Sequence, residues 1–333
     1  MGARQLRRLQ LGRETTMGSL AAATVVWRGS GTIRDDTVVS FATEDVGVLG
    51  GIDRTFMPSQ GASLALTPTE ATFEQLPYIM EGGIKKLGTG VTDTGGSGKI
   101  YTYPMSSTAA NTIQSFSIEG GDNSGAEVVK FGVVTDFTLN GQVFKPIMMQ
   151  ANLIAWESTA QAFTTSLTPI AVDAAIMFAP GKLCIDAIGT AAGTTQVSGS
   201  LKSMNIKVKT GVEPVGSVEN LHYTTVAVED PSLTGDLTFY WDSNAIAEKA
   251  KWLAQTGRTV QLRFDGAALN TAGSAYSKKA LIMNMYGVKW TKFSEIQADG
   301  GHDVITASFE NRYNTTATQA ATWIIVNESS TLP

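Results

Sequence analysis

The residues most suggestive of chemistry are Gly95-Gly96-Ser97-Gly98-Lys99, because glycines followed by lysine are typical of a phosphate-binding loop. That motif also needs Ser or Thr directly after the lysine and a further glycine five positions before Gly98. The chain has Ile100 and Asp93 at these places. Glycine-rich stretches are mostly connections between elements. We therefore predict a flexible hairpin tip over residues 87–98.

Histidine and cysteine are too scarce for most catalytic or metal sites. His222 and His302 are the only histidines, and Cys184 is the only cysteine. A single thiol excludes an internal disulfide and a multi-thiolate zinc site. Cys184 lies in an apolar stretch, where a thiol usually behaves as a small buried side chain. No Gly-x-Ser-x-Gly motif is present, so the sequence indicates no nucleophilic catalysis.

Two further groups of residues favour structural roles. Glu119 and Asp122 flank a Gly-Gly turn and suggest calcium ligands, but the EF-hand order is missing and turns commonly use Asp and Asn. The tryptophans are scattered over both halves, which favours packing or subunit contacts over a stacking platform for sugars or bases. They are Trp27, Trp156, Trp241, Trp252, Trp290 and Trp323. We expect no enzyme, no cofactor and no metal.

Alternating apolar and polar residues predict a mainly β fold. Strands are indicated at residues 64–67, 101–103, 113–118 and 203–209. Glycine pairs between such segments predict tight turns and antiparallel hairpins. Two segments have helical patterns. One is predicted from the capping box at Thr67–Glu70 to about Glu81, and the other begins after Asp242 or Ser243.

In the first predicted helix, Phe73, Leu76 and Met80 share the buried face, Pro77 bends or shortens it, and Gly82-Gly83 ends it. In the second, an apolar stripe is predicted to face the core, with charged residues outside it and Gly257 as the end. The stripe is Ile246, Ala250, Leu253 and Ala254.

The order of elements repeats along the chain. A strand, a helix, a glycine turn and further strands lead to a long hairpin in each half, at 128–137 with 150–156 and at 284–293 with 304–313. A chain of 333 residues also exceeds what one core usually serves. We therefore predict two domains, at 20–179 and 180–333, after a basic N-terminal arm at 1–19.

The net charge of −5 hides an acidic body. Without residues 1–14, which hold four arginines and one glutamate, the chain has 21 basic and 29 acidic residues and a net charge of −8. Such a body is a poor candidate for gripping DNA. The arm arginines are expected to contact an acidic neighbouring subunit rather than DNA. They are Arg4, Arg7, Arg8 and Arg13.

No export signal or membrane anchor is expected. The charged N-terminus is not followed by an apolar stretch of about 7–15 residues. The most apolar later segment, 170–179, is shorter than the ~20 residues of a membrane-spanning helix and contains Asp173.

Three segments make the chain resemble the tail tube proteins of long-tailed, siphovirus-type bacteriophages. Leu11 to Ala22, with Glu14-Thr15-Thr16-Met17-Gly18 inside it, is similar to the leader before their first strand. Residues 180–186 and 194–211 resemble the strand pair that opens their second domain. The likeness extends over residues 11–330, and the arginine-rich start before residue 11 has no counterpart.

The resemblance implies two tandem tail-tube β-sandwich or barrel domains, each with one flanking α-helix, closing into a ring through oligomerisation. Three chains would complete a pseudo-sixfold ring, and stacked rings would form the virion's tail tube, the conduit for genome delivery. Implied partners are further copies of the chain, the tape measure protein and the tail-end proteins. DNA would pass without specific binding, along a wall expected to be net negative.

Assembly would take place in the host cytoplasm. The predicted loop over 87–98 is expected to become ordered on stacking and to contact the next ring through Gly88, Gly90, Asp93, Gly95, Gly96, Ser97 and Gly98. The same subunit also fits a phage-derived, tailocin-like particle and, less well, a secreted β-rich adhesin.

Overall fold

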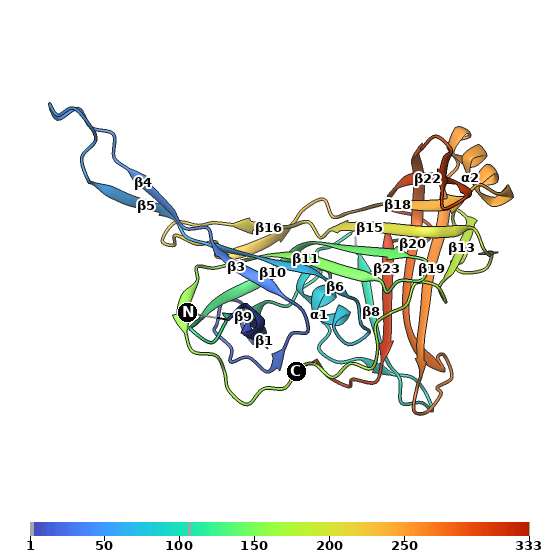
Figure 1. Cartoon of the computed structure of the whole chain (residues 1–333), viewed down its shortest axis with the longest axis horizontal. Coiled ribbons are helices and arrows are strands. Elements are labelled where there is room, and N and C mark those ends of the chain that lie inside the picture. Colours follow the sequence, from blue (N-terminus) through green and yellow to red (C-terminus); the bar gives the residue numbers. More distant parts are fainter. Residues whose placement is uncertain (1–2, 106–107, 333) are drawn as a thin grey trace.

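The computed structural model describes residues 3–105 and 108–332 and is built mainly from antiparallel strands (Figure 1). Its central feature is a row of eight strands, four from before residue 180 and four from after it. In order these are β3 (Gly31–Asp35), β6 (Ala62–Glu70), β11 (Met148–Ala155), β10 (Ala126–Gln142), β15 (Leu201–Lys209), β18 (Ser232–Tyr240), β22 (His302–Asn311) and β20 (Lys278–Phe293). The pairing of β10 with β15 joins the two groups.

The first part of β20 belongs to a second group of strands. There it pairs with β19 (Arg258–Ala268) on one edge and with β23 (Ala321–Asn327) on the other. β13 (Lys182–Ala187) pairs with the outer edge of β19, and β8 (Lys99–Met105) pairs with the outer edge of β23. In Figure 1, β8, β19, β20 and β23 run steeply across the direction of β10, β11 and β15. The C-terminal strand β23 therefore ties the end of the chain to its first half.

A smaller sheet covers the N-terminal part of the molecule. β1 (Arg8–Arg13) pairs with β9 (Phe116–Gly121), and β9 pairs with the start of β10. β10 passes from this sheet into the row of eight at a bulge, where Phe131 has φ of 58°. A positive φ is unusual for a bulky residue and marks a backbone held by its surroundings.

Short elements complete the chain. Two hairpins extend from the row of eight, β4 (Val38–Phe41) with β5 (Thr55–Ser59), and β16 (Val212–Val215) with β17 (Thr225–Val228). The others are η1 (Arg4–Leu6), β2 (Val25–Val26), β7 (Val91–Thr92), β12 (Thr159–Gln161), β14 (Gln196–Val197) and β21 (Gln297–Asp299).

The predicted mainly β fold is confirmed, and so are both long hairpins, as β10 with β11 and β20 with β22. One large hydrophobic cluster contains residues from both sides of residue 180, such as Phe137, Leu139, Phe239 and Phe309. The two halves thus share one core where their strands meet. The domain boundary at 180 stays a prediction.

Helix α1 (Leu76–Gly83) begins later than the sequence predicts. Residues 67–70 remain in β6, where Glu70 pairs with Met148, and the Thr67 hydroxyl donates to the Ser30 carbonyl. The capping-box prediction there is wrong because the strand pairing continues past it. Pro77 lies in the first turn, where its missing N–H costs nothing.

Leu76 and Met80 are buried as predicted, and so is every other residue of α1, while the buried Phe73 lies before the helix. The glycine pair allows close packing against the row of eight. A Cβ on Gly83 would come within 2.6 Å of the Thr210 methyl, and one on Gly82 within 2.9 Å of a Val134 methyl. The helix ends after Gly83, as predicted.

Helix α2 (Ser243–Leu253) starts where predicted, with the Asp242 carboxylate accepting from the N–H groups of Asn244 and Ala245. The predicted buried stripe is wrong. Ile246 and Leu253 are 50% and 71% exposed, whereas Glu248 is buried. Glu248 faces inward because it accepts from the Arg258 guanidinium and from the Trp290 indole N–H, each at 2.9 Å.

Candidate assembly surfaces

The row of eight strands has one face in the core and one open face. The alternation of buried and accessible residues along β18 and β15 shows this division. On the open face, side chains pair across neighbouring strands, as Ser308 does with Asp236 at 2.6 Å and Asn152 with Asp136 at 2.8 Å. Many of the side chains on this face are threonine, serine and asparagine, so the face is hydrophilic and suited to contact with water.

Charges of both signs lie on the open face. The acidic residues there include Asp136, Asp236 and Glu310, and the basic residues include Lys207 and Lys209. Opposite charges on neighbouring strands favour pairing and leave little net field. The face carries no strong electrostatic preference.

Both ends of the row are open in the part of the chain that the structure describes. β3 pairs with β6 alone. At the other end, β20 pairs with β19 only as far as Val288, so its residues 289–293 have β22 on one side and no strand on the other. Unpaired strand edges are templates for pairing with another chain.

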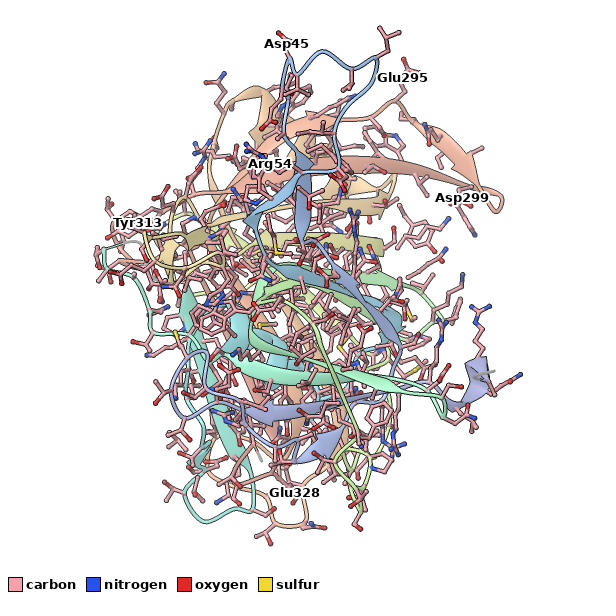
Figure 2. All side chains as sticks on the ribbon, turned by 90° about the vertical axis from the view of Figure 1, so that its left-hand side faces the viewer. Asp45, Arg54, Glu295, Asp299, Tyr313 and Glu328 are labelled. Carbon is pink, nitrogen blue, oxygen red and sulfur yellow. The ribbon has the colours of Figure 1, made fainter. Side chains whose placement is uncertain are left out.

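The hairpin formed by β4 and β5 projects away from the body (Figure 1), and Figure 2 shows Asp45 and Arg54 on it, at the end of the view opposite Glu328. Its apolar side chains are exposed, including Phe41 at 70% and Phe56 at 55%. The others are Val38, Val39, Val46, Val48, Leu49 and Met57. An exposed apolar cluster of this size marks an interaction surface. No chemical motif in the sequence of this segment indicates such a surface.

The glycine-rich segment is anchored within its own chain. The Asp93 carboxylate accepts from the N–H groups of Ala275 and Tyr276, the latter at 2.7 Å. Ser97 N–H donates to the Thr271 carbonyl, and a Cβ on Gly96 would meet Gly273 at 2.5 Å. The expectation that this segment is a flexible tip ordered only by stacking is wrong over 93–98, because the loop between β19 and β20 holds it.

Replacing Asp93 by Asn should remove part of the acid dependence of stability. Burial raises the pKa of Asp93, but the hydrogen bonds from Ala275, Tyr276 and Ser274 together lower it by more than burial raises it. The pKa therefore lies below its ordinary value of 3.8. A carboxyl group whose pKa is lower in the folded chain than in the unfolded chain stabilises the fold at pH values above its unfolded-state pKa. This stabilisation is lost as the pH falls through the folded-state pKa.

Thermal unfolding at pH 7 and below about pH 4 measures this difference. The Asp93→Asn variant should be less stable than the wild type at pH 7 and should lose less on acidification. Asp45→Asn, on the exposed hairpin, is the matched control and should behave as the wild type. Equal acid losses in wild type and Asp93→Asn would contradict the assignment.

The contact of Gly88, Gly90, Asp93, Gly95, Gly96, Ser97 and Gly98 with a neighbouring ring stays a prediction. Gly88 N–H donates to the Glu81 carboxylate at 2.7 Å, and Lys99 donates to the Thr92 hydroxyl at 2.7 Å. These bonds fix both ends of the segment and give Lys99 a structural partner in place of a phosphate.

The four arginines of the predicted arm are in different environments. Arg4, Arg7 and Arg8 are exposed, and the Arg8 guanidinium lies 4.2 Å from the centre of the Phe163 ring. Arg13 ends β1 and forms an ion pair of 2.6 Å with the fully buried Glu81. Arg13 thus serves its own chain, and the subunit contact of the other three stays a prediction. Residues 1–2 of the arm lie outside the described residues.

Glu14 is buried directly after β1 and organises the bulge of β10. One carboxylate oxygen accepts from Phe131 N–H at 2.7 Å and from the Ser117 hydroxyl, and the other from Gly18 N–H at 2.7 Å and from the Ser115 hydroxyl. Four donors around one carboxylate satisfy its buried charge. The glutamate of the leader-like segment thus has a structural role, which its position in the sequence alone does not indicate.

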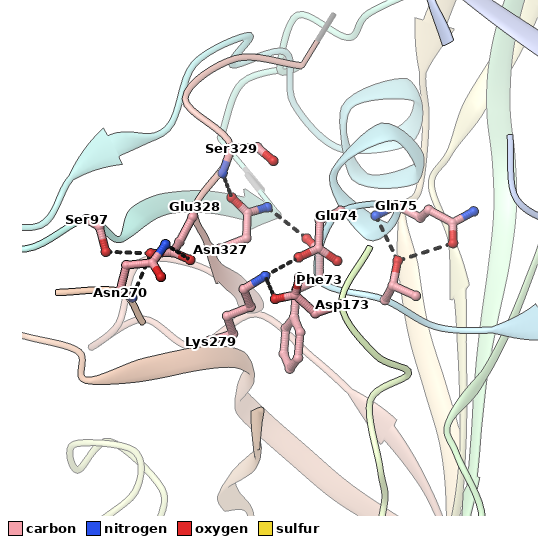
Figure 3. A network of polar contacts seen from close by, with 11 residues as sticks. Phe73, Glu74, Gln75, Ser97, Asp173, Asn270, Lys279, Asn327, Glu328 and Ser329 are labelled. Atoms are coloured by element: carbon pink, nitrogen blue, oxygen red, sulfur yellow. Dashed lines mark hydrogen bonds and ion pairs between the residues drawn. The ribbon is translucent and has the colours of Figure 1, made fainter. Parts of the chain in front are cut away.

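A second buried charge joins the two halves (Figure 3). Lys279, at the start of β20, lies between Glu74, at 2.7 Å, and Asp173. Nearby, the Asn327 amide donates to the Phe73 carbonyl at 2.8 Å, and Glu328 accepts from Asn270 N–H. No spacing in the sequence indicates this network, because its contacts join residues between 58 and 254 positions apart.

The remaining candidates for chemistry have structural partners. Burial raises the pKa of the Cys184 thiol, which keeps it protonated. His222 lies against Trp156, with 3.9 Å between ring centres, and Glu119 accepts from Thr164. Within residues 3–105 and 108–332, no three His, Cys, Asp or Glu side chains are grouped as metal ligands. No helix in this described part is long and apolar enough to span a membrane.

The comparisons with known proteins identify the family of the chain. A family model described as phage tail tube protein matches residues 5–312. The comparison with curated proteins found no similar sequence. The family is structural and not enzymatic, and its members are components of the virion tail. The match covers most of the chain, and the chain belongs to the phage tail tube protein family.

Proposed function

We propose that three copies of the chain close into a ring and that the rings stack into the tube, with 20–179 and 180–333 as equivalent repeats. The supporting observation is the order of the row of eight. β3, β6, β11 and β10 have the same sequence order and pairing as β15, β18, β22 and β20. β10, the last strand of the first set, pairs with β15, the first strand of the second set. The same kind of pairing would join one chain to the next.

Ring closure would use the two open edges. A head-to-tail contact gives a closed ring when its rotation divides a full turn. Three chains would supply roughly 24 strands, which at about 4.8 Å each make a wall about 115 Å around. Membrane porins with about 16–18 strands already enclose an aqueous channel. The ring is therefore wide enough to be hollow.

The open face of the row is the proposed wall of the channel. It is hydrophilic and carries both signs of charge, and the expected net negative charge of the wall stays a prediction. A mixed wall without a basic stripe still lets DNA pass without specific binding, since no run of cations is available to displace its counterions.

The projecting hairpin of β4 and β5 is the proposed contact with a copy in the adjacent ring. Its apolar side chains have no cover within the described chain, and a second copy is present at the high local concentration of a tube. The tape measure protein, the tail-end proteins, the delivery of a phage genome and assembly in the host cytoplasm remain predictions from the resemblance. A tailocin-like particle would use the same subunit.

Replacing Phe41 and Phe56 together by Ser should reduce tube length and yield strongly while leaving the single chain stable. Exposed residues away from special features change stability by about 0.5 kcal/mol or less. Electron microscopy measures tube length, and thermal unfolding of the unassembled chain measures stability. Leu253→Ser on α2, 71% exposed, is the control and should assemble as the wild type. Full-length tubes from the double variant would contradict this contact.

The ring proposal is tested by the mass of the smallest closed assembly. Native mass spectrometry of assembled protein, dissociated gently, should give a species of about 106 kDa, three times the chain mass of 35.3 kDa. A ring of six chains, with twice that mass, would overturn the equivalence of the two halves.

A further inference from the structure

The junction between the halves has a defined register. β10 pairs antiparallel with β15, and Asp136 lies opposite Lys209 and Phe137 opposite Val208. Thr210 continues the pairing, since its N–H donates to the Thr135 carbonyl at 2.9 Å and its hydroxyl donates to the same carbonyl at 2.8 Å. Because 135 and 210 are hydrogen-bonded, 136 and 209 form the closer, non-hydrogen-bonded pair.

The bulges of the two long hairpins align β20 with β10. Between β10 and β11 the register shifts at Val134/Asp136, and between β20 and β22 it shifts at Trp290/Lys292. After the shifts, Phe137 lies opposite Ala151 and Phe293 opposite Ala307. The segment Thr135-Asp136-Phe137 is therefore equivalent to Thr291-Lys292-Phe293.

The other edge aligns in the same way. Ile206 lies opposite Gly235, which lies opposite Phe309. Ile33 lies opposite Leu64, which lies opposite Leu153. Phe309 and Leu153 are equivalent positions. Their cross-strand partners, Trp290 and Val134, each directly precede the threonine at the bulge. Ile33 therefore corresponds to Ile206, and Asp36-Thr37 corresponds to Lys209-Thr210.

We propose that β20 of one copy pairs antiparallel with β3 of the next in this register, with Lys292 opposite Asp36. The inference rests on the proposed ring and specifies its contact. Phe293 then lies opposite Asp35, Ser294 opposite Arg34, and Thr37 takes the place of Thr210. Lys292 is exposed, and Asp36 has only an exposed ion pair with Arg34 to give up. Such exposed pairs contribute little.

The charge pair at the junction within the chain, β10 with β15, is reversed at the proposed junction between chains, β20 with β3. This reversal favours an alternation of first and second halves around the ring. Within the chain an acid on β10 meets a base on β15, whereas between chains a base on β20 meets an acid on β3. Pairing β20 with β15 of another copy would place Lys292 opposite Lys209. Pairing β10 with β3 would place Asp136 opposite Asp36. Like charges directly opposite each other are destabilising, so wrong junctions are disfavoured.

Charge reversal tests the pair. Lys292→Asp and Asp36→Lys should each lower ring formation by about tenfold or more, measured by sedimentation, and the double variant should return to within about threefold of the wild type. Lys278→Asp, on an exposed residue at the other end of β20, is the control and should assemble normally. Normal assembly of both single variants would overturn the proposal.

Cysteine cross-linking tests the register independently. A non-hydrogen-bonded pair has Cα atoms about 4.5 Å apart, within disulfide range, whereas a diagonal pair is about 7–8 Å apart. Lys292→Cys with Asp36→Cys should therefore link neighbouring copies under mild oxidation, and Lys292→Cys with Arg34→Cys should not. The native Cys184 is buried. If the wild type forms rings but Lys292→Cys with Asp36→Cys gives no cross-link, the register is refuted and the ring is not. If the wild type forms no rings, the proposed function is refuted.

Discussion

Replacing Lys279 by Met should lower the free energy of unfolding by about 3–5 kcal/mol, the cost of breaking a buried ion pair by removing one partner. Lys279 and Glu74 are both 6% exposed, so without the ammonium group the Glu74 carboxyl group loses its buried partner in a site that water barely reaches. Asp173, the other partner, is 61% exposed and offers no compensation. Chemical denaturation of the unassembled chain measures the loss.

Two further variants separate this charge effect from a packing effect. Lys278→Met changes the neighbouring exposed lysine and should shift stability by no more than about 0.5 kcal/mol. Glu74→Leu combined with Lys279→Met removes both buried charges and should recover most of the loss. A double variant as unstable as Lys279→Met alone would show that the lysine stem, and not the pair, matters.

Replacing Glu14 by Ala should destabilise the chain by roughly 2–4 kcal/mol, because four donors lose one acceptor. Two are backbone N–H groups, of Gly18 and Phe131, that cannot turn elsewhere. Phe131 also has the positive φ at the bulge of β10, a conformation that persists only while its surroundings hold it. We therefore expect increased hydrogen exchange at Phe131 and its neighbours as well as a lower unfolding free energy.

Glu14→Gln should destabilise nearly as much as Glu14→Ala, since its amide NH2 would face a backbone N–H on whichever side it lies. Glu127→Ala, an exposed change on the same strand β10, is the control and should be neutral. Wild-type stability of Glu14→Gln would contradict the proposed role of the carboxylate.

Periodicity was sufficient to predict both long hairpins and most of the predicted strands, because alternation along residues 203–209 reflects one buried face directly. Periodicity located β9 only in part, since this strand starts at Phe116 and not at residue 113. It failed at α2, where Ile246 and Leu253 have the spacing of a buried stripe and lie exposed. The buried face there is set by Glu248, whose partners Arg258 and Trp290 come from other strands. Sequence spacing within a helix does not contain that information.

The surfaces proposed for assembly were less predictable than the fold. The glycine-rich loop stood out by composition, yet its Asp93 binds the same chain, and the hairpin at 38–59 had no motif at all. Lys292 and Asp36 resemble any exposed charges until the registers of six strand pairs show that they are equivalent to Asp136 and Lys209. Such a correspondence depends on pairing between distant strands, which local patterns do not specify.

A cryo-electron microscopy reconstruction of the assembled tube tests the central claim most directly. We expect rings of three chains in which the row of eight strands runs unbroken from copy to copy, β20 beside β3, with its open face towards the channel. A ring of six chains, or a channel lined by other strands, would contradict it.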